Sequence, residues 1–216
     1  MKKAVIFDMD GLMIDSERVT YEEYCRKLET LNLSFDEATY RLCLGKNKVG
    51  ICQVFYDHFG DDFPMKEVWD DVHIWIDERL AKHVPLKTGL LELLKYLKDN
   101  NYKTIVATSS TRDRVDTILK NAKITEYFDD SICGDEVTHG KPNPEIFLTA
   151  CKKLNVEPKE ALVLEDSEAG ILAAYDGNID VICVPDMKYP ETDFANKTTK
   201  IVANLNDVIT YLKDLD

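Results

Sequence analysis

Short apolar runs rich in β-branched residues, separated by segments with helical periodicity, are the feature that most constrains the fold of this chain. The runs lack polar alternation, which is typical of parallel strands covered by helices on both faces. Between most of them lie helical patterns, such as Leu90, Leu91, Leu94 and Leu97. The alternation predicts an α/β fold with a largely parallel sheet. The predicted strands span residues 4–7, 104–107, 131–133, 161–164, 181–184 and 200–202.

One stretch, residues 16–84, interrupts this alternation. It contains no convincing strand pattern, and Val68, Val72, Ile76 and Leu80 form part of one wide helical stripe. A length of 216 residues accommodates one domain plus a modest insertion. We therefore expect a Rossmann-like α/β core, built from residues 1–15 and 85–216, with an inserted all-helical cap domain over residues 16–84.

The charge of the chain excludes some classes of partner. It has 27 Lys and Arg against 40 Asp and Glu, a formal net charge of −13, which repels nucleic acid and anionic membrane surfaces. No apolar run approaches the ~20 residues of a membrane span, and no secretory signal pattern begins the sequence. The six cysteines are scattered without a C-x-x-C pair, as expected of buried thiols in a reducing compartment. We expect a cytoplasmic monomer.

Acidic residues follow the first predicted strand. Asp8 and Asp10 are two residues apart, so in an extended segment both point the same way, and Gly11 allows a sharp turn after them. In open α/β sheets, ligands bind beyond the carboxyl ends of the strands. An isolated pair of this kind is more often only the start of a solvated loop.

A second acidic pair, Glu165 and Asp166, follows the predicted strand 161–164. Carboxylates converging at neighbouring strand ends repel one another unless a cation lies among them, and ligands that are all oxygen favour Mg²⁺. The two pairs together therefore predict a magnesium site, which would bring phosphate with it.

Hydroxyl groups and one lysine also lie at the end of a predicted strand or the start of a predicted helix. Thr108 and Ser109 follow the strand 104–107 and enter a helix, where hydroxyls and free amides can hold an anion. The alternative that this turn is an ordinary helix cap stays open. Lys141 precedes another predicted helix within the sequence Gly-Lys-Pro-Asn-Pro.

These four elements, in this order, resemble the haloacid dehalogenase superfamily. The resemblance rests on D-x-D-G at residues 8–11, Thr108-Ser109, Lys141 in G-K-P-x-P, and Glu165-Asp166. The helical insertion is similar to the cap of the subgroup that contains β-phosphoglucomutase and phosphoglycolate phosphatase.

The resemblance implies an aspartyl-phosphate mechanism. Asp8 would be the nucleophile and Asp10 the general acid and base. Mg²⁺ would be held by Asp8, the backbone carbonyl of Asp10 and Asp166, with Glu165 in direct contact or one shell away. Thr108, Ser109 and Lys141 would position the phosphoryl oxygens.

The cap would supply substrate specificity. Candidate substrate contacts are Arg18, Thr20, Lys46, Asn47 and Lys48, and for each of them a solvated surface position is an open alternative. Thr20 stands where the mutase pattern has a histidine, Lys48 where it has an arginine, and Thr111 where it has a lysine. These departures favour a phosphatase over a mutase.

The sequence therefore predicts a Mg²⁺-dependent phosphatase acting on a small phosphorylated metabolite. A sugar phosphomutase similar to β-phosphoglucomutase is the first alternative. A non-catalytic receiver that carries a phosphoaspartate is the second, and the helical insertion and Asp10 argue against it.

Overall fold

The computed structural model describes residues 2–215, which form two compact units. One unit comprises residues 2–15 and 84–215, and the other comprises Ser16–His83. Val84 thus groups with the α/β unit, one residue away from the boundary expected from the sequence.

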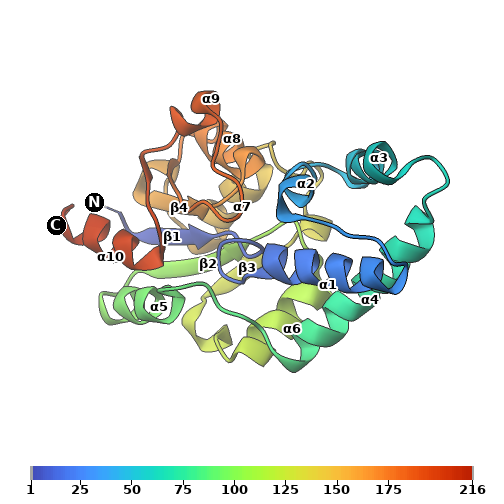
Figure 1. Cartoon of the computed structure of the whole chain (residues 1–216). Coiled ribbons are helices and arrows are strands. Elements are labelled where there is room, and N and C mark those ends of the chain that lie inside the picture. Colours follow the sequence, from blue (N-terminus) through green and yellow to red (C-terminus); the bar gives the residue numbers. More distant parts are fainter. Residues whose placement is uncertain (1, 216) are drawn as a thin grey trace. The chain divides into compact units, whose positions relative to one another are not determined.

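The α/β unit confirms the predicted fold class, since its six strands form one parallel sheet. The strand order is β3-β2-β1-β4-β5-β6, and the view in Figure 1 shows the sheet with helices above and below it. The strands are β1 (Ala4–Phe7), β2 (Lys103–Ala107), β3 (Asp130–Ile132), β4 (Ala161–Glu165), β5 (Asp180–Cys183) and β6 (Lys200–Ile201).

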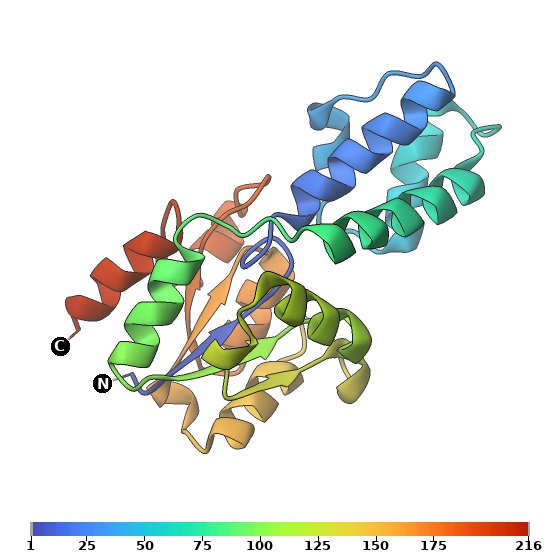
Figure 2. The ribbon, with the colours of Figure 1, turned by 90° about the horizontal axis from the view of Figure 1, so that it is seen from below.

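Two helical layers cover this sheet. Helices α7 and α8 lie on one face, and α5, α6 and α10 lie on the other (Figure 1, Figure 2). The helices of this unit are α5 (Leu90–Asp99), α6 (Arg112–Ala122), α7 (Glu145–Leu154), α8 (Glu168–Asp176), α9 (Thr192–Ala195) and α10 (Leu205–Lys213). Single 3₁₀ turns lie at Thr125–Tyr127, Gly134–Glu136 and Pro158–Glu160.

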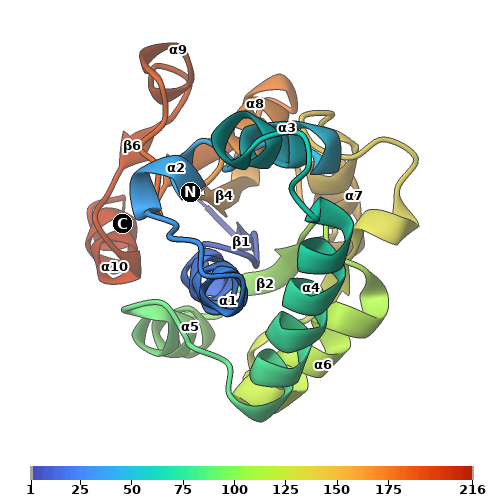
Figure 3. The same cartoon turned by 45° about the vertical axis from the view of Figure 1, so that its right-hand side comes forward.

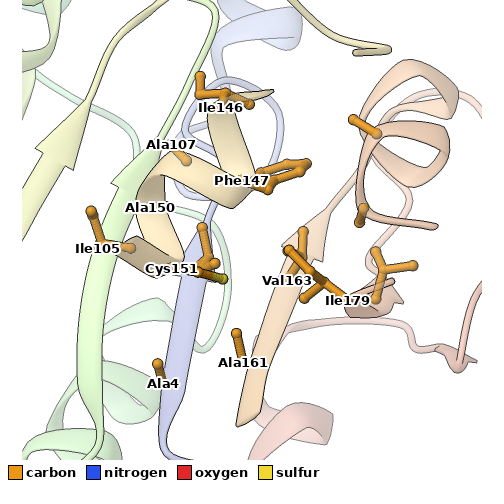
Figure 4. Packing of buried hydrophobic residues seen from close by; sticks show 14 of the residues in the cluster. Ala4, Ile105, Ala107, Ile146, Phe147, Ala150, Cys151, Ala161, Val163 and Ile179 are labelled. Carbon is orange, nitrogen blue, oxygen red and sulfur yellow. The ribbon is translucent and has the colours of Figure 1, made fainter. Parts of the chain in front are cut away.

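Alternate residues of the central strands point into the layer beneath α7 and α8. Ile105, Ala107 and Val163 meet Phe147 and Cys151 there, as Figure 4 shows. Every residue of β1 is buried, because a central strand with helices on both faces has no solvent side. The core therefore holds β1 and β4 rigidly, and the candidate site lies at their carboxyl ends.

The second unit is wholly helical in the described chain, and Figure 3 shows its helices. They are α1 (Ser16–Thr30), α2 (Glu37–Arg41), α3 (Lys48–Phe59) and α4 (Met65–Lys82). Helices α1 and α4 pack together, and the buried ammonium of Lys27 joins them through Glu67 at 2.7 Å and Asp71 at 2.6 Å. Phe55 stacks on Phe35 and Phe63 to fill the interior of this unit.

The amphipathic helix α5 provides a stability test with a matched control. Leu97 is fully buried, whereas Leu91 on the same helix is 47% exposed. We expect Leu97→Ala to lower the free energy of unfolding by about 2–5 kcal/mol and Leu91→Ala to change it by less than about 0.5 kcal/mol. Urea unfolding measures both, and equal costs would contradict the packing described here.

Candidate active site

The site is built at the point where the strand order reverses. Strand β2 lies on one side of β1 and β4 lies on the other, so the order of the strands along the chain reverses at β1. Ligands of open α/β sheets bind at such a switch point. The backbone amide of Asp8 donates to the carbonyl of Leu164 at 3.1 Å, so Asp8 is still held by the neighbouring strand. Its side chain is almost fully buried.

Lys141 joins the two acidic strand ends. Its ammonium donates to Asp8 Oδ1 and to Glu165 Oε1, the latter at 2.6 Å, and its side chain is only 6% exposed. The ammonium nitrogen of Lys141 also lies 4.8 Å from the ring centroid of the buried Phe147. Residues distant in sequence are thus brought into one buried ion-pair cluster.

The titration behaviour of this cluster follows from its burial. Desolvation raises the pKa of Asp8 above its ordinary value, and the Lys141 ammonium opposes that effect. Desolvation acts to lower the pKa of Lys141, but the Asp8 and Glu165 carboxylates outweigh it and raise the pKa above the usual range of lysine. The Lys141 ammonium alone therefore does not offset the cost of burying Asp8 in its ionised form.

Glu165 is fully buried and has both carboxylate oxygens occupied. Oε1 accepts from Lys141, while Oε2 accepts from the backbone amides of Asp166 and Ser167 and from the Ser167 hydroxyl, at 2.9–3.0 Å. A Cβ on Gly170 would lie 1.8 Å from Oε1. The Glu165 carboxylate therefore fits against the start of α8 only because residue 170 has no side chain.

Asp166 lies against the loop that follows β1. Gly11 has φ 85°, a left-handed conformation that favours glycine, and a Cβ there would lie 2.2 Å from Asp166 Oδ2. One carboxylate oxygen from each of Asp8, Glu165 and Asp166 lies within 4.8 Å of the other two. This oxygen-only donor set, together with the uncompensated charge, fits a divalent cation such as Mg²⁺.

Asp10 has partners that the sequence analysis did not identify. Its Oδ2 accepts from the Ser110 hydroxyl at 2.7 Å, and its Oδ1 accepts from Arg114 Nη2 at 3.0 Å. Ser110 lies beside the predicted pair Thr108-Ser109, so the hydroxyl-rich turn was a usable signal for it. No comparable sequence signal marked Arg114.

The other predicted phosphate contacts lie at the end of β2. Thr108 is buried, and its Oγ1 accepts from the Ser110 amide at 3.1 Å. Ser109 is exposed, and its carbonyl lies so close to Gly134 that a Cβ there would approach it to 2.2 Å. The turn is thereby fixed against the end of β3.

The predicted substrate contacts of the cap lie within the helical unit, where Thr20 and Lys46 line a cavity of about 150 Å³. Thr20 donates its hydroxyl to the Ser16 carbonyl at 2.8 Å. The remaining lining residues are Glu17, Tyr24, Tyr40, Cys43, Leu44, Gly45, Ile51, Trp69 and His73.

The other three cap candidates have structural partners. Arg18 pairs with Glu37 at 2.8 Å, and Asn47 accepts from the Gly50 amide at 3.0 Å as the N-cap of α3. The ammonium of Lys48 lies 4.6 Å from the centroid of the Trp69 ring. Trp69 and His73, which the sequence analysis did not select, stack on one another beside the cavity.

Comparison with known proteins identifies the class to which this fold and site belong. The sequence pattern of the family described as haloacid dehalogenase-like hydrolase matches residues 5–184. The chain belongs to this family, and it is a phosphoric monoester hydrolase.

Two curated relatives and one solved structure support that assignment. A phosphorylated carbohydrates phosphatase of Thermotoga maritima is 30% identical over 83% of each chain. A validoxylamine A 7′-phosphate phosphatase of Streptomyces hygroscopicus subsp. limoneus is 32% identical over 81% of each chain. A crystal structure from Thermotoga maritima, provisionally described as a β-phosphoglucomutase, covers 100% of both chains at 27% identity, with a TM-score of 0.83.

The contact between Gly170 and Glu165 gives a test of the site's construction. A methyl group at position 170 must displace the Glu165 carboxylate, so we expect Gly170→Ala to lower the free energy of unfolding by about 1–3 kcal/mol. The control is Gly140→Ala, because nothing lies within 4 Å of a Cβ at that position. Urea unfolding compares the two, and a Gly170→Ala protein as stable as the control would contradict the proximity described.

Proposed function

We propose that this hydrolase is a Mg²⁺-dependent phosphatase of a small phosphomonoester and works through an aspartyl phosphate on Asp8. The observation that carries the proposal is the buried contact between Asp8 and Lys141 at the carboxyl end of β1. Burial raises the pKa of Asp8, the Lys141 ammonium opposes that effect, and a bound divalent cation would lower the pKa further, which keeps the carboxylate ionised and available as a nucleophile. The phosphatase relatives support a phosphorylated sugar or similar metabolite as the substrate.

Asp8, Asp166 and the backbone carbonyl of Asp10 would hold the metal ion. Bound there, Mg²⁺ would supply positive charge against the phosphoryl oxygens. Glu165 is better suited to another task, because its oxygens are already taken by Lys141, Asp166, and Ser167. We assign Glu165 to holding Lys141 in place.

In the first half-reaction, Asp8 attacks phosphorus and a new P–O bond forms while the bond to the leaving oxygen breaks. Asp10 gives its proton to that oxygen, so the product departs as an alcohol. Lys141 and the Thr108 hydroxyl would donate to the phosphoryl oxygens and stabilise their charge. The Ser109 amide would hold them in the same orientation.

In the second half-reaction, water attacks the phosphorus of the aspartyl phosphate. Its proton passes to the Asp10 carboxylate, the bond between phosphorus and Asp8 breaks, and the electron pair returns to Asp8. Inorganic phosphate leaves and both carboxylates regain their starting states. The cycle consumes only substrate and water.

The cap would select the leaving group, and the cavity supports Thr20 and Lys46 as the contacts within it. Arg18 and Asn47 would reach substrate only by exchanging their present partners, Glu37 and Gly50. Lys48 would act beside Trp69.

A sugar phosphomutase remains the alternative within the family, because it would use the same aspartyl phosphate. Supplying a hexose 1-phosphate separates the two: the phosphatase releases inorganic phosphate, whereas the mutase forms hexose 6-phosphate. Formation of the hexose 6-phosphate as the main product would overturn the phosphatase proposal. Membership in a hydrolase family argues against the receiver alternative.

The nucleophile is tested by Asp8→Asn. An amide cannot form the aspartyl phosphate, so we expect phosphate release from p-nitrophenyl phosphate with Mg²⁺ to fall on the order of 10³-fold or more. Asp176→Asn, an exposed position in the last turn of α8, is the control and should keep wild-type activity. Turnover by Asp8→Asn near the wild-type rate would refute the assignment.

The metal is tested by chelation followed by Mg²⁺ titration. Activity should vanish with the chelator and return with Mg²⁺, since the phosphate and the acidic cluster repel each other without it. Asp166→Asn removes one proposed ligand, so the half-saturating Mg²⁺ concentration should rise at least about 10-fold. Calorimetric titration with Mg²⁺ alone measures binding directly. Unchanged affinity in Asp166→Asn would exclude that residue as a ligand.

A further inference from the structure

Asp10 is held at both of its carboxylate oxygens by residues outside the motifs of the sequence. The Ser110 hydroxyl donates to Oδ2 at 2.7 Å, and the guanidinium of Arg114 donates to Oδ1 at 3.0 Å. Asp10 and Arg114 are both about one quarter exposed. The Asp10–Arg114 ion pair is therefore only partly buried.

The backbone that carries these two donors is fixed. The Gly134 amide donates to the Ser110 carbonyl at 2.8 Å, which ties the turn to the end of β3. Arg112 anchors the first turn of α6 through the Ser131 carbonyl at 3.2 Å and Glu136 at 2.6 Å. Val115, which directly follows Arg114, is fully buried. The backbone positions of Ser110 and Arg114 are thus set by contacts with the core.

A restraint at two atoms fixes the orientation of a carboxylate. An aspartate side chain has two rotatable bonds, and a single donor leaves rotation about one of them free. Donors to both oxygens remove that freedom, while each oxygen keeps a second lone pair for another hydrogen bond. Proton transfer requires such placement, within about 2.6–3.2 Å of the group that gives the proton.

We propose that Arg114 is a positioning residue for Asp10, holding its carboxylate in the orientation that accepts a proton from the attacking water. The inference rests on the proposed function and concerns its second half-reaction. There the water proton passes to Asp10, the bond between phosphorus and Asp8 breaks, and the electron pair stays on Asp8. In this role Arg114 donates to the Asp10 carboxylate and takes no part in the bonds that form and break.

The test separates the two half-reactions with p-nitrophenyl phosphate, whose leaving group departs without needing a proton. Rapid mixing and acid quench measure the formation of phosphoenzyme and of p-nitrophenolate in wild type, Arg114→Met and Arg114→Lys. Lys120→Met is the control, since it removes a positive charge from an exposed position at the far end of α6.

In Arg114→Met, phosphorylation of the enzyme should proceed at the wild-type rate, while steady-state turnover falls about 10-fold or more. Phosphoenzyme should accumulate as a result. Arg114→Lys should recover part of the hydrolysis rate because it keeps a donor and a charge, and Lys120→Met should match wild type. A role in folding alone would not slow hydrolysis selectively.

Two results would overturn this inference without touching the proposed function: unchanged turnover in Arg114→Met, or phosphorylation and hydrolysis that fall by the same factor. The failure of the proposed function looks different. In that case wild type itself would form no phosphoenzyme that depends on Asp8, and the inference about Arg114 would fall with it.

Discussion

The rest of the site depends on the buried ammonium of Lys141, which lies between carboxylates from two different strands. Asp8 follows β1 and Glu165 ends β4, and both are nearly inaccessible to water. Bringing two carboxylates this close in a buried place is costly unless a cation joins them, and removing one partner of such a group is expected to cost ~3–5 kcal/mol. The lysine therefore shapes the ends of both strands as well as the chemistry. Glu165 in turn depends on the absence of a side chain at Gly170.

Charge compensation explains how an acidic protein can admit a phosphate group. The chain carries a formal charge of −13, and Asp8, Glu165 and Asp166 add three carboxylates around one ammonium. The same imbalance that would repel a phosphomonoester is what attracts a divalent cation to the cluster. Arg114 forms a separate ion pair with Asp10. Lys141 is thus shared by Asp8 and Glu165, Arg114 pairs with Asp10, and the proposed metal ion would offset the charge that remains.

The α/β class was predictable because buried parallel strands such as residues 4–7 and 161–164 have an unbroken apolar pattern, while helices repeat at another period. Strand ends were harder to place: β2 begins at Lys103, whose exposed side chain gives no apolar signal. Motif order indicated Asp8 and Lys141, but the contact of Arg114 with Asp10 depends on how α6 is anchored, and no local pattern encodes that. The two roles open to Glu165 could be weighed only once its hydrogen bonds were known.

The central claim is that the side chain of Asp8 becomes phosphorylated during turnover. Its most direct test is to quench the wild-type enzyme in acid while it consumes a phosphomonoester, reduce the acyl phosphate with borohydride, and map the reduced residue by mass spectrometry of peptides. The account predicts that position 8 is converted into homoserine, and that this conversion requires both substrate and Mg²⁺. Reduction at another carboxylate, or none at position 8 during active turnover, would contradict it.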